Sequence, residues 1–153
     1  LLMTFILLGG FVHVNAQSYD QALGLRGGTT NGITYKHFLS EQDAAELIAG
    51  FQDNGLRITG LYERHVSAFD EEGFYWYYGA GGHLGFYDND YDPPYRDGDR
   101  DGGTAIGLDG IAGLEYRIPE IPLTISADVK PFLEFTETDL YLWDTGLSLR
   151  YTF

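Results

Sequence analysis

Hydrophobic and polar residues alternate with a period of two along residues 140–153, at the end of the chain. One face carries Tyr141, Trp143, Thr145, Leu147, Leu149, Tyr151 and Phe153, and the other carries Leu140, Leu142, Asp144, Gly146, Ser148, Arg150 and Thr152. Successive side chains of a β-strand point to opposite faces, so the segment predicts a strand with one hydrophobic face and, from Asp144 onward, one polar face. Soluble sheets alternate too, but aromatic residues at both ends of the hydrophobic face, with aliphatic residues between, are typical of a strand crossing a bilayer.

Seven earlier segments also have the composition of strands and lie between turn signals. The predicted strands are residues 19–27, 33–39, 44–52, 56–69, 74–87, 104–118, 123–135 and 140–153. The sequence Asp53-Asn54-Gly55 is a strong hairpin signal. Residues 44–48 could instead begin a helix capped by Ser40 or Asp43. We prefer a strand there because eight strands close a barrel and seven do not suit this class.

The charged residues that fall on the polar faces are nearly balanced, with five basic and six acidic side chains, in a chain of formal charge −14. Together with His83 they form the predicted ion network of the barrel lumen: Arg26, Lys36, Glu46, Arg57, Glu63, His83, Asp109, Glu115, Asp128, Lys130, Asp144 and Arg150. Buried charges persist only when they are paired, and an eight-stranded barrel is just wide enough for side chains to fill it. The pattern therefore predicts an all-β, antiparallel, up-and-down transmembrane barrel with a filled lumen. A lipocalin-like soluble barrel has the opposite arrangement.

The amino-acid composition further limits the classes of fold, binding site and partner that the sequence allows. The 153 residues include 12 Tyr and 10 Phe but only one Met, which favours strands over helices. The absence of Cys excludes a disulfide framework and thiolate metal sites. A pI near 4.3 argues against a nucleic-acid partner, which requires a basic surface. A mean hydropathy of −0.19 fits a barrel, in which only alternate residues meet lipid.

Residues 1–16 form the one continuous apolar run of the sequence, ending at Val14-Asn15-Ala16. The run resembles the hydrophobic region and cleavage site of a secretory signal peptide, without its charged beginning. A membrane anchor helix is the alternative, but spanning requires about 20 apolar residues. We therefore expect a cleaved signal over 1–16 and a mature barrel domain over 17–153.

The signal-like start, the eight predicted strands and the terminal sequence Leu-Ser-Leu-Arg-Tyr-Thr-Phe resemble small eight-stranded outer-membrane barrels of Gram-negative bacteria, of the OmpA/OmpX type. The last segment is similar to the insertion signal that such proteins present to the barrel-assembly machinery, carried by Leu147, Leu149, Tyr151 and Phe153. The resemblance implies an outer-membrane location, lipid contact, periplasmic termini and a monomer. The outer loops would be residues 28–32, 53–55, 88–103 and 136–139. It implies no activity, because such barrels host many functions.

The predicted loop 88–103 holds six Asp and two Arg. Its sequence from Asp97 to Gly102 matches D-x-D-x-D-G, in which alternate carboxylates converge on Ca²⁺. Position twelve of that motif is Leu108 and not a bidentate Glu. Two interpretations remain open: a solvated acidic loop, or a weak divalent-cation site formed by Asp97, Asp99 and Asp101. No other cofactor is expected.

His65 and Ser67 repeat the His-x-Ser spacing that barrel-type lipid A deacylases use, in which the His activates the Ser. They fall near the periplasmic end of the fourth predicted strand, far from the outer leaflet, so we interpret them as rim residues. We interpret His83 as an interior His with satisfied partners. The sequence thus predicts a non-catalytic protein with a structural or surface-interaction role through residues 88–103. A lipid-modifying enzyme and a small-ligand-binding barrel are the alternatives.

Overall fold

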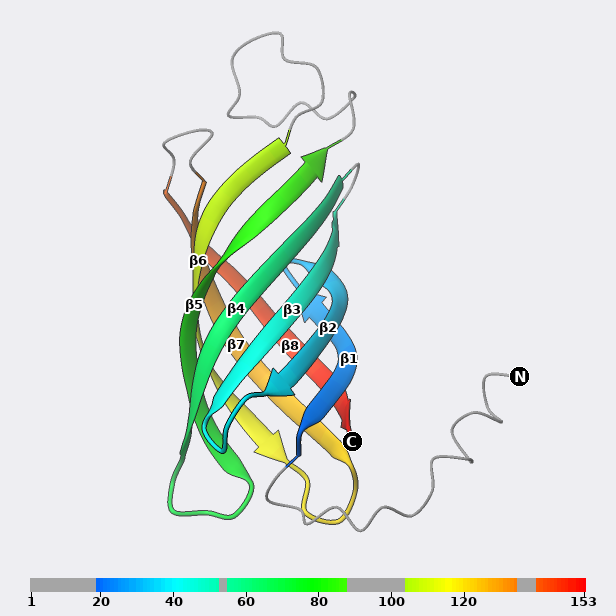
Figure 1. The fold of residues 1–153 in the computed structure, drawn as a ribbon, viewed down its shortest axis with the longest axis vertical. Helices are drawn as coiled ribbons and strands as arrows, with labels where there is room; N and C mark the ends of the chain where they lie inside the picture. Colours follow the sequence, from blue (N-terminus) through cyan, green and yellow to red (C-terminus); the bar gives the residue numbers. More distant parts are fainter. Residues whose placement is uncertain (1–18, 53–54, 88–103, 135–139) are drawn as a thin grey trace, which may run out of the picture.

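Eight antiparallel strands form a single closed sheet. The computed structural model describes residues 19–52, 55–87, 104–134 and 140–153, so the expected signal over 1–16 and the loop residues Asp97, Asp99 and Asp101 lie outside it. The strands are β1 (Gln21–Gly28), β2 (Asn31–Phe38), β3 (Asp43–Gln52), β4 (Gly55–Ser67), β5 (Phe74–Tyr87), β6 (Thr104–Arg117), β7 (Leu123–Glu134) and β8 (Leu140–Thr152). Each strand pairs with the next, and β8 pairs with β1 (Figure 1). The predicted up-and-down barrel is confirmed, and β3 is a strand.

The two ends of the barrel differ in height around its circumference. The first and last described residues, Tyr19 and Phe153, lie at the end that also carries the β2–β3, β4–β5 and β6–β7 turns (Figure 1). We call this the terminus end and the opposite one the loop end. At the loop end the wall is low at β1 and β2, with 8 residues each, and high at β5 and β6, with 14 each. In the described part of the chain, no helix is long and apolar enough to span a membrane.

The pairing of β8 with β7 shifts near the loop end. Lys130 pairs with Asp144, but the neighbouring pair, Phe132 with Tyr141, is displaced by one residue. The sequence pattern of residues 140–153 did not predict this shift. Pro131 lies at the break, and proline has no backbone N–H to donate to a neighbouring strand. A β-bulge accommodates the extra residue of β8.

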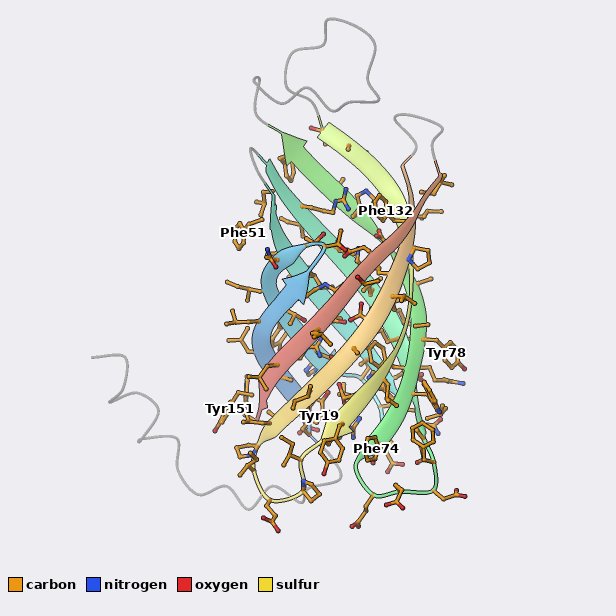
Figure 2. All side chains as sticks on the ribbon, turned by 180° about the vertical axis from the view of Figure 1, so that it is seen from behind. Tyr19, Phe51, Phe74, Tyr78, Phe132 and Tyr151 are labelled. Carbon is orange, nitrogen blue, oxygen red and sulfur yellow. The ribbon has the colours of Figure 1, made fainter. Side chains whose placement is uncertain are left out.

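The barrel has hydrophobic residues outside and charged residues inside. Leu25, Leu147 and Leu149 are 68%, 65% and 52% exposed. The side chains of Phe51, Tyr78 and Tyr151 also point away from the barrel (Figure 2). Inside, large apolar side chains form only one small cluster among the described residues: Ile48, Leu61, Tyr77 and Ile111. The rest of the described interior is lined mainly by polar and charged residues.

Candidate functional site

The lumen brings all twelve residues of the predicted ion network together. Each of them is at most 6% exposed. Arg117, which the prediction did not include, is also buried and faces the lumen from the end of β6. With Arg117, the buried charged side chains among the described residues number six basic and six acidic, so their formal charges cancel. The whole formal charge of −14 is therefore carried by residues outside this buried set.

Three basic and three acidic side chains form a cluster near the terminus end, which we call the lower cluster. Its members are Lys36, Glu46, Glu63, Glu115, Arg117 and Arg150. Lys36 lies at its centre, with Nζ 2.9 Å from a carboxylate oxygen of Glu63 and 3.6 Å from one of Glu115. A third carboxylate, that of Glu46, is 3.9 Å away. One ammonium group thus links acids from three different strands.

Arg150 is the largest fully buried side chain of the lower cluster, at 1% exposure. Its guanidinium donates to Glu46, to Ser126 Oγ at 2.7 Å and to Thr34 Oγ1 at 3.2 Å. The Thr34 hydroxyl in turn donates to Glu46. Because β8 and β3 are separated by two strands, this ion pair crosses the lumen and does not run along a shared strand edge.

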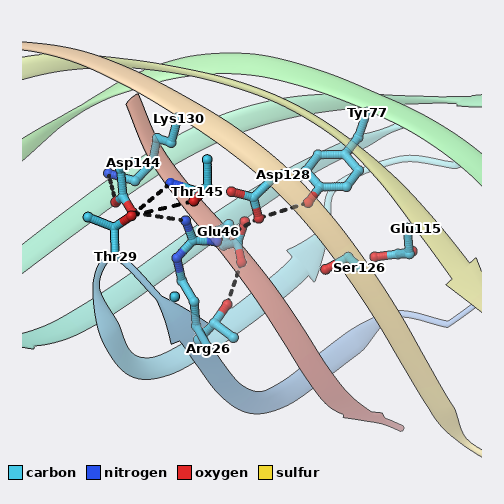
Figure 3. Close-up of polar contacts among 12 residues, drawn as sticks. Arg26, Thr29, Glu46, Tyr77, Glu115, Ser126, Asp128, Lys130, Asp144 and Thr145 are labelled. Carbon is cyan, nitrogen blue, oxygen red and sulfur yellow. Dashed lines mark hydrogen bonds and ion pairs between the residues drawn. The ribbon is translucent and has the colours of Figure 1, made fainter. Parts of the chain in front are cut away.

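Three further basic and three acidic side chains form a second cluster toward the loop end, which we call the upper cluster. Its members are Arg26, Arg57, Asp109, Asp128, Lys130 and Asp144. Arg26 donates to Asp128 at 2.6 Å and lies 3.6 Å from Asp144. Lys130 pairs with Asp109 at 3.1 Å, and it also pairs with Asp144 at 3.2 Å (Figure 3). Each cluster is balanced by itself, which the sequence did not reveal.

Two aromatic contacts and a histidine complete the upper cluster. His83 Nδ1 lies 2.7 Å from Asp109, so His83 has an acidic partner inside the lumen. Arg57 packs its guanidinium over the ring of Phe132, at 4.6 Å from the centroid. The same ring meets His83 edge-on at 5.7 Å. These contacts show that Phe132 closes over the buried charges near the loop end.

Tyr77 connects the two clusters through an apolar layer. Its ring lies under Lys36 Nζ, at 4.4 Å from the centroid, and its hydroxyl donates to Asp128 at 3.1 Å (Figure 3). Ile48, Leu61 and Ile111 pack with it in the buried apolar cluster. Along β6, for example, Ile111 lies between Glu115 of the lower cluster and Asp109 of the upper. The interior is thus layered, from ionic through apolar to ionic.

Two glycines of the wall leave room for this arrangement. A Cβ at Gly113 would collide with the Tyr77 ring, and a Cβ at Gly146 would collide with the guanidinium of Arg26. Gly113 lies between the inward residues Ile111 and Glu115 of β6, and Gly146 lies between the inward residues Asp144 and Ser148 of β8. The small residues of the inner face therefore set where the large ones can lie.

The lower end of the lumen opens into a cavity of about 540 Å³, which we call the mouth pocket. It is lined by Tyr19, Asp20, Phe38, Leu39, Ser40, Glu41, Gln42, His65, Ser67, Tyr75 and Arg117. Tyr19 donates to Glu115 at 3.0 Å, and burial raises the pKa of this hydroxyl well above its ordinary value. Arg117 Nε also donates to Glu115, at 3.0 Å. Its guanidinium lies 3.9 Å from the centroid of Tyr75.

His65 and Ser67, interpreted from the sequence as rim residues, both line the mouth pocket at the end of β4, and the histidine is buried. His65 is only 2% exposed, stacked on Tyr77 at 5.2 Å and packed against Phe38 at 4.9 Å. Its Nε2 lies 3.4 Å from Lys36 Nζ, so the imidazole belongs to the surroundings of the lower cluster. Ser67 is exposed and lines the mouth pocket. Both face inward, away from the surface where an enzyme would meet membrane lipid.

The remaining predicted sites lie elsewhere. Leu147, Leu149, Tyr151 and Phe153 are 65%, 52%, 47% and 51% exposed, on the outward face that the prediction assigned to them. In the described ranges, no group of three or more His, Asp or Glu side chains is placed to hold a metal ion. Asp97, Asp99 and Asp101 fall outside those ranges.

Alternation alone could have identified two of the residues that the prediction missed. On β6 the inward positions have odd numbers, which includes Arg117, and the same holds for His65 on β4. Both lie within the segments expected to be strands. Tyr19 precedes β1, so no strand pattern places it.

Comparison with known proteins supports the fold. No protein-family model matches the chain, and no curated protein matches it. A crystal structure of the N-terminal β-barrel domain of OprF from Pseudomonas aeruginosa is similar, with a TM-score of 0.67. The two share 17% sequence identity over 90% of this chain and 98% of the other. At that identity the likeness shows the eight-stranded barrel fold alone, and it agrees with the resemblance noted in the sequence.

Proposed function

We propose that this protein is an integral outer-membrane β-barrel without catalytic activity. The observation that carries the proposal is the polarity of the wall, with exposed Leu, Ile and aromatic side chains outside and twelve buried charges inside. In water such an outer surface would be a large exposed apolar patch, which marks an interaction surface or a membrane-facing one. A closed barrel satisfies every strand edge, so it can cross a bilayer without unpaired backbone groups.

The orientation follows from the chain ends. The terminus end would face the periplasm and the loop end the cell exterior, as in the OmpA/OmpX-type barrels that the sequence resembles. Outer-membrane lipid would surround the wall, and the barrel-assembly machinery would recognise the segment from Leu147 to Phe153 during insertion. The wall needs no partner subunit to close, which supports a monomer.

The working surface in this proposal is the acidic segment 88–103, in a structural or surface-interaction role. Because side chains fill the lumen, the barrel would anchor this segment outside the cell and would not conduct solutes. The alternating carboxylates of Asp97, Asp99 and Asp101 would bind a divalent cation weakly. A lipid-modifying enzyme is less well supported, because His65 is enclosed and Ser67 faces the mouth pocket.

Cysteine labelling tests location and orientation together, because the natural chain has no Cys. Asp99→Cys lies in the acidic segment, and Glu71→Cys lies in the β4–β5 turn at the terminus end. We expect a membrane-impermeant maleimide to label Asp99→Cys on intact cells and Glu71→Cys only after the outer membrane is opened. Labelling of Glu71→Cys on intact cells would refute the orientation. Absence of the protein from the outer-membrane fraction would refute the location.

Two measurements test the rest of the proposal. Calcium titration of the protein should show weak binding that is lost in the variant with Asn at positions 97, 99 and 101. Equal heats of calcium binding for the natural protein and this variant at millimolar calcium would refute the proposed cation site. In planar bilayers we expect no stable conductance, and reproducible single-channel steps would contradict a filled lumen.

A further inference from the structure

The mouth pocket is the polar cavity that the proposed function leaves without a role. Its volume of about 540 Å³ is within the range of sites that hold small ligands or side chains. It is assembled from the start of the chain, the β2–β3 turn and the lower ends of β4, β5 and β6. Residues distant in sequence thus form one concavity at the terminus end.

The charge around the pocket is negative. Asp20 and Glu41 line it and are exposed, and Asp70 and Glu71 are exposed on the turn between β4 and β5 at the same end. The exposed Arg64 is paired with Asp43 at 2.9 Å. Arg117 is the one arginine among the lining residues, and its charge is paired with Glu115 at 3.0 Å, while the other cations of the lower cluster lie beneath the pocket with Glu46 and Glu63. A positively charged guest would therefore be drawn to this end, with Asp20 and Glu41 as its charge partners.

The aromatic side chains of the pocket wall already contact one organic cation of this chain. Tyr75, Tyr19 and Phe38 already surround a guanidinium, that of Arg117, at 3.9, 4.8 and 5.1 Å from their ring centroids. Aromatic faces attract cations, and a planar guanidinium stacks on them well.

The inner wall has an unused hydrogen-bonding position. His65 is 2% exposed and lines the pocket, and its Nδ1 has no hydrogen-bond partner in the described part of the chain. A buried polar atom of this kind favours a guest that supplies the missing partner. A peptide can do so, because its backbone carries both donors and acceptors.

We propose that the mouth pocket binds a Lys or Arg side chain of a basic peptide segment, with Asp20 and Glu41 neutralising the cation and the ring of Tyr75 forming one wall. This goes beyond the role assigned to residues 88–103 and does not depend on it. The partner would be a protein with an exposed basic segment on the side of the membrane that holds the chain termini.

The test uses the full barrel in a zwitterionic detergent and two matched probes. The first is the peptide N-acetyl-Gly-Arg-Gly-amide, and the second has citrulline, a neutral isostere, in place of Arg. We expect saturable binding of the Arg peptide and binding at least about tenfold weaker for citrulline, because a charge-assisted contact is lost. Equal affinity for both peptides would overturn the proposal.

Two double variants separate the pocket from general attraction to an acidic surface. Asp20→Asn with Glu41→Gln should weaken the Arg peptide about tenfold. Asp70→Asn with Glu71→Gln removes the same charge outside the pocket. It should change affinity less than about twofold at 0.15 M salt, where the Debye length is about 8 Å. All four positions are exposed, so unfolding midpoints should match those of the natural protein. Equal losses in both variants would refute a specific site.

Discussion

Removing Arg150 is the most direct test of the layered, charge-balanced lumen. Arg150→Met keeps the bulk of the side chain but leaves Glu46 without its closest cation, and the lower cluster then carries a net negative charge. An uncompensated buried charge costs about 3–5 kcal/mol. Domain stabilities are about 5–15 kcal/mol, so this is a large share of the total.

The partner variant sharpens the test. Glu46→Met alone leaves the lower cluster with a net positive charge and should cost a similar amount. The variant with both changes restores balance, because Lys36 and Arg117 still face Glu63 and Glu115. We therefore expect the double variant to lose about 3 kcal/mol less than the sum of the two single losses. The cause is electrostatic, since neither charge is left alone in the lumen.

The assay is reversible urea unfolding of the barrel in lipid vesicles, followed by the fluorescence of its two Trp residues. With a loss of about 3–5 kcal/mol and a slope of about 1–3 kcal/mol per molar urea, each single change should lower the midpoint by about 1–5 M. Arg64→Met is the matched control, because its pair with Asp43 is solvent-exposed and should leave the midpoint nearly unchanged. Additive losses in the double variant, or equal shifts for Arg150→Met and Arg64→Met, would refute the reasoning.

Three further changes test other parts of the structure. Tyr77→Phe removes the hydroxyl that donates to Asp128 and should lower the unfolding free energy by about 1 kcal/mol. Gly113→Ala places a Cβ against both the Tyr77 ring and the backbone carbonyl oxygen of Ala127 and should cost about 1–3 kcal/mol, measured by the same unfolding assay; no loss would show that ring and strand can both move. Phe153→Ala should reduce the amount of barrel assembled in cells without changing the urea midpoint of the purified protein, and a lowered midpoint would instead assign Phe153 a role in stability.

The order and facing of the strands could be predicted because both depend on local pattern. Every strand end lies within two residues of its expected place, and β5 agrees at both ends. Alternation also placed Glu46 and Arg150 on inner faces. It could not show that they meet, because their strands are not neighbours and the contact depends on how the strands are staggered around the barrel.

The bulge of β8 and the burial of His65 are two features that the alternation of hydrophobic and polar residues does not predict. Near Pro131 the period of two continues in the sequence while the pairing shifts by one residue. For His65, the pattern gives a place near the end of a strand, but it does not show that the rings of Phe38 and Tyr77 pack against the imidazole. Both features depend on tertiary surroundings, which the pattern of a single strand does not specify.

The distribution of charge along the barrel axis indicates where recognition can occur. The lumen is neutral in both clusters. On the outer wall of the described strands the charged side chains are Arg64 and Asp43, which pair with each other. The formal charge of −14 must therefore lie toward the two ends of the barrel and in the segments outside the described ranges. Wall and lumen then present no net field to lipid or solute. Charge-based interactions with other molecules are therefore expected at the two ends of the barrel, and they should weaken as the salt concentration rises. The buried ion pairs of the lumen are shielded from salt ions and should not weaken.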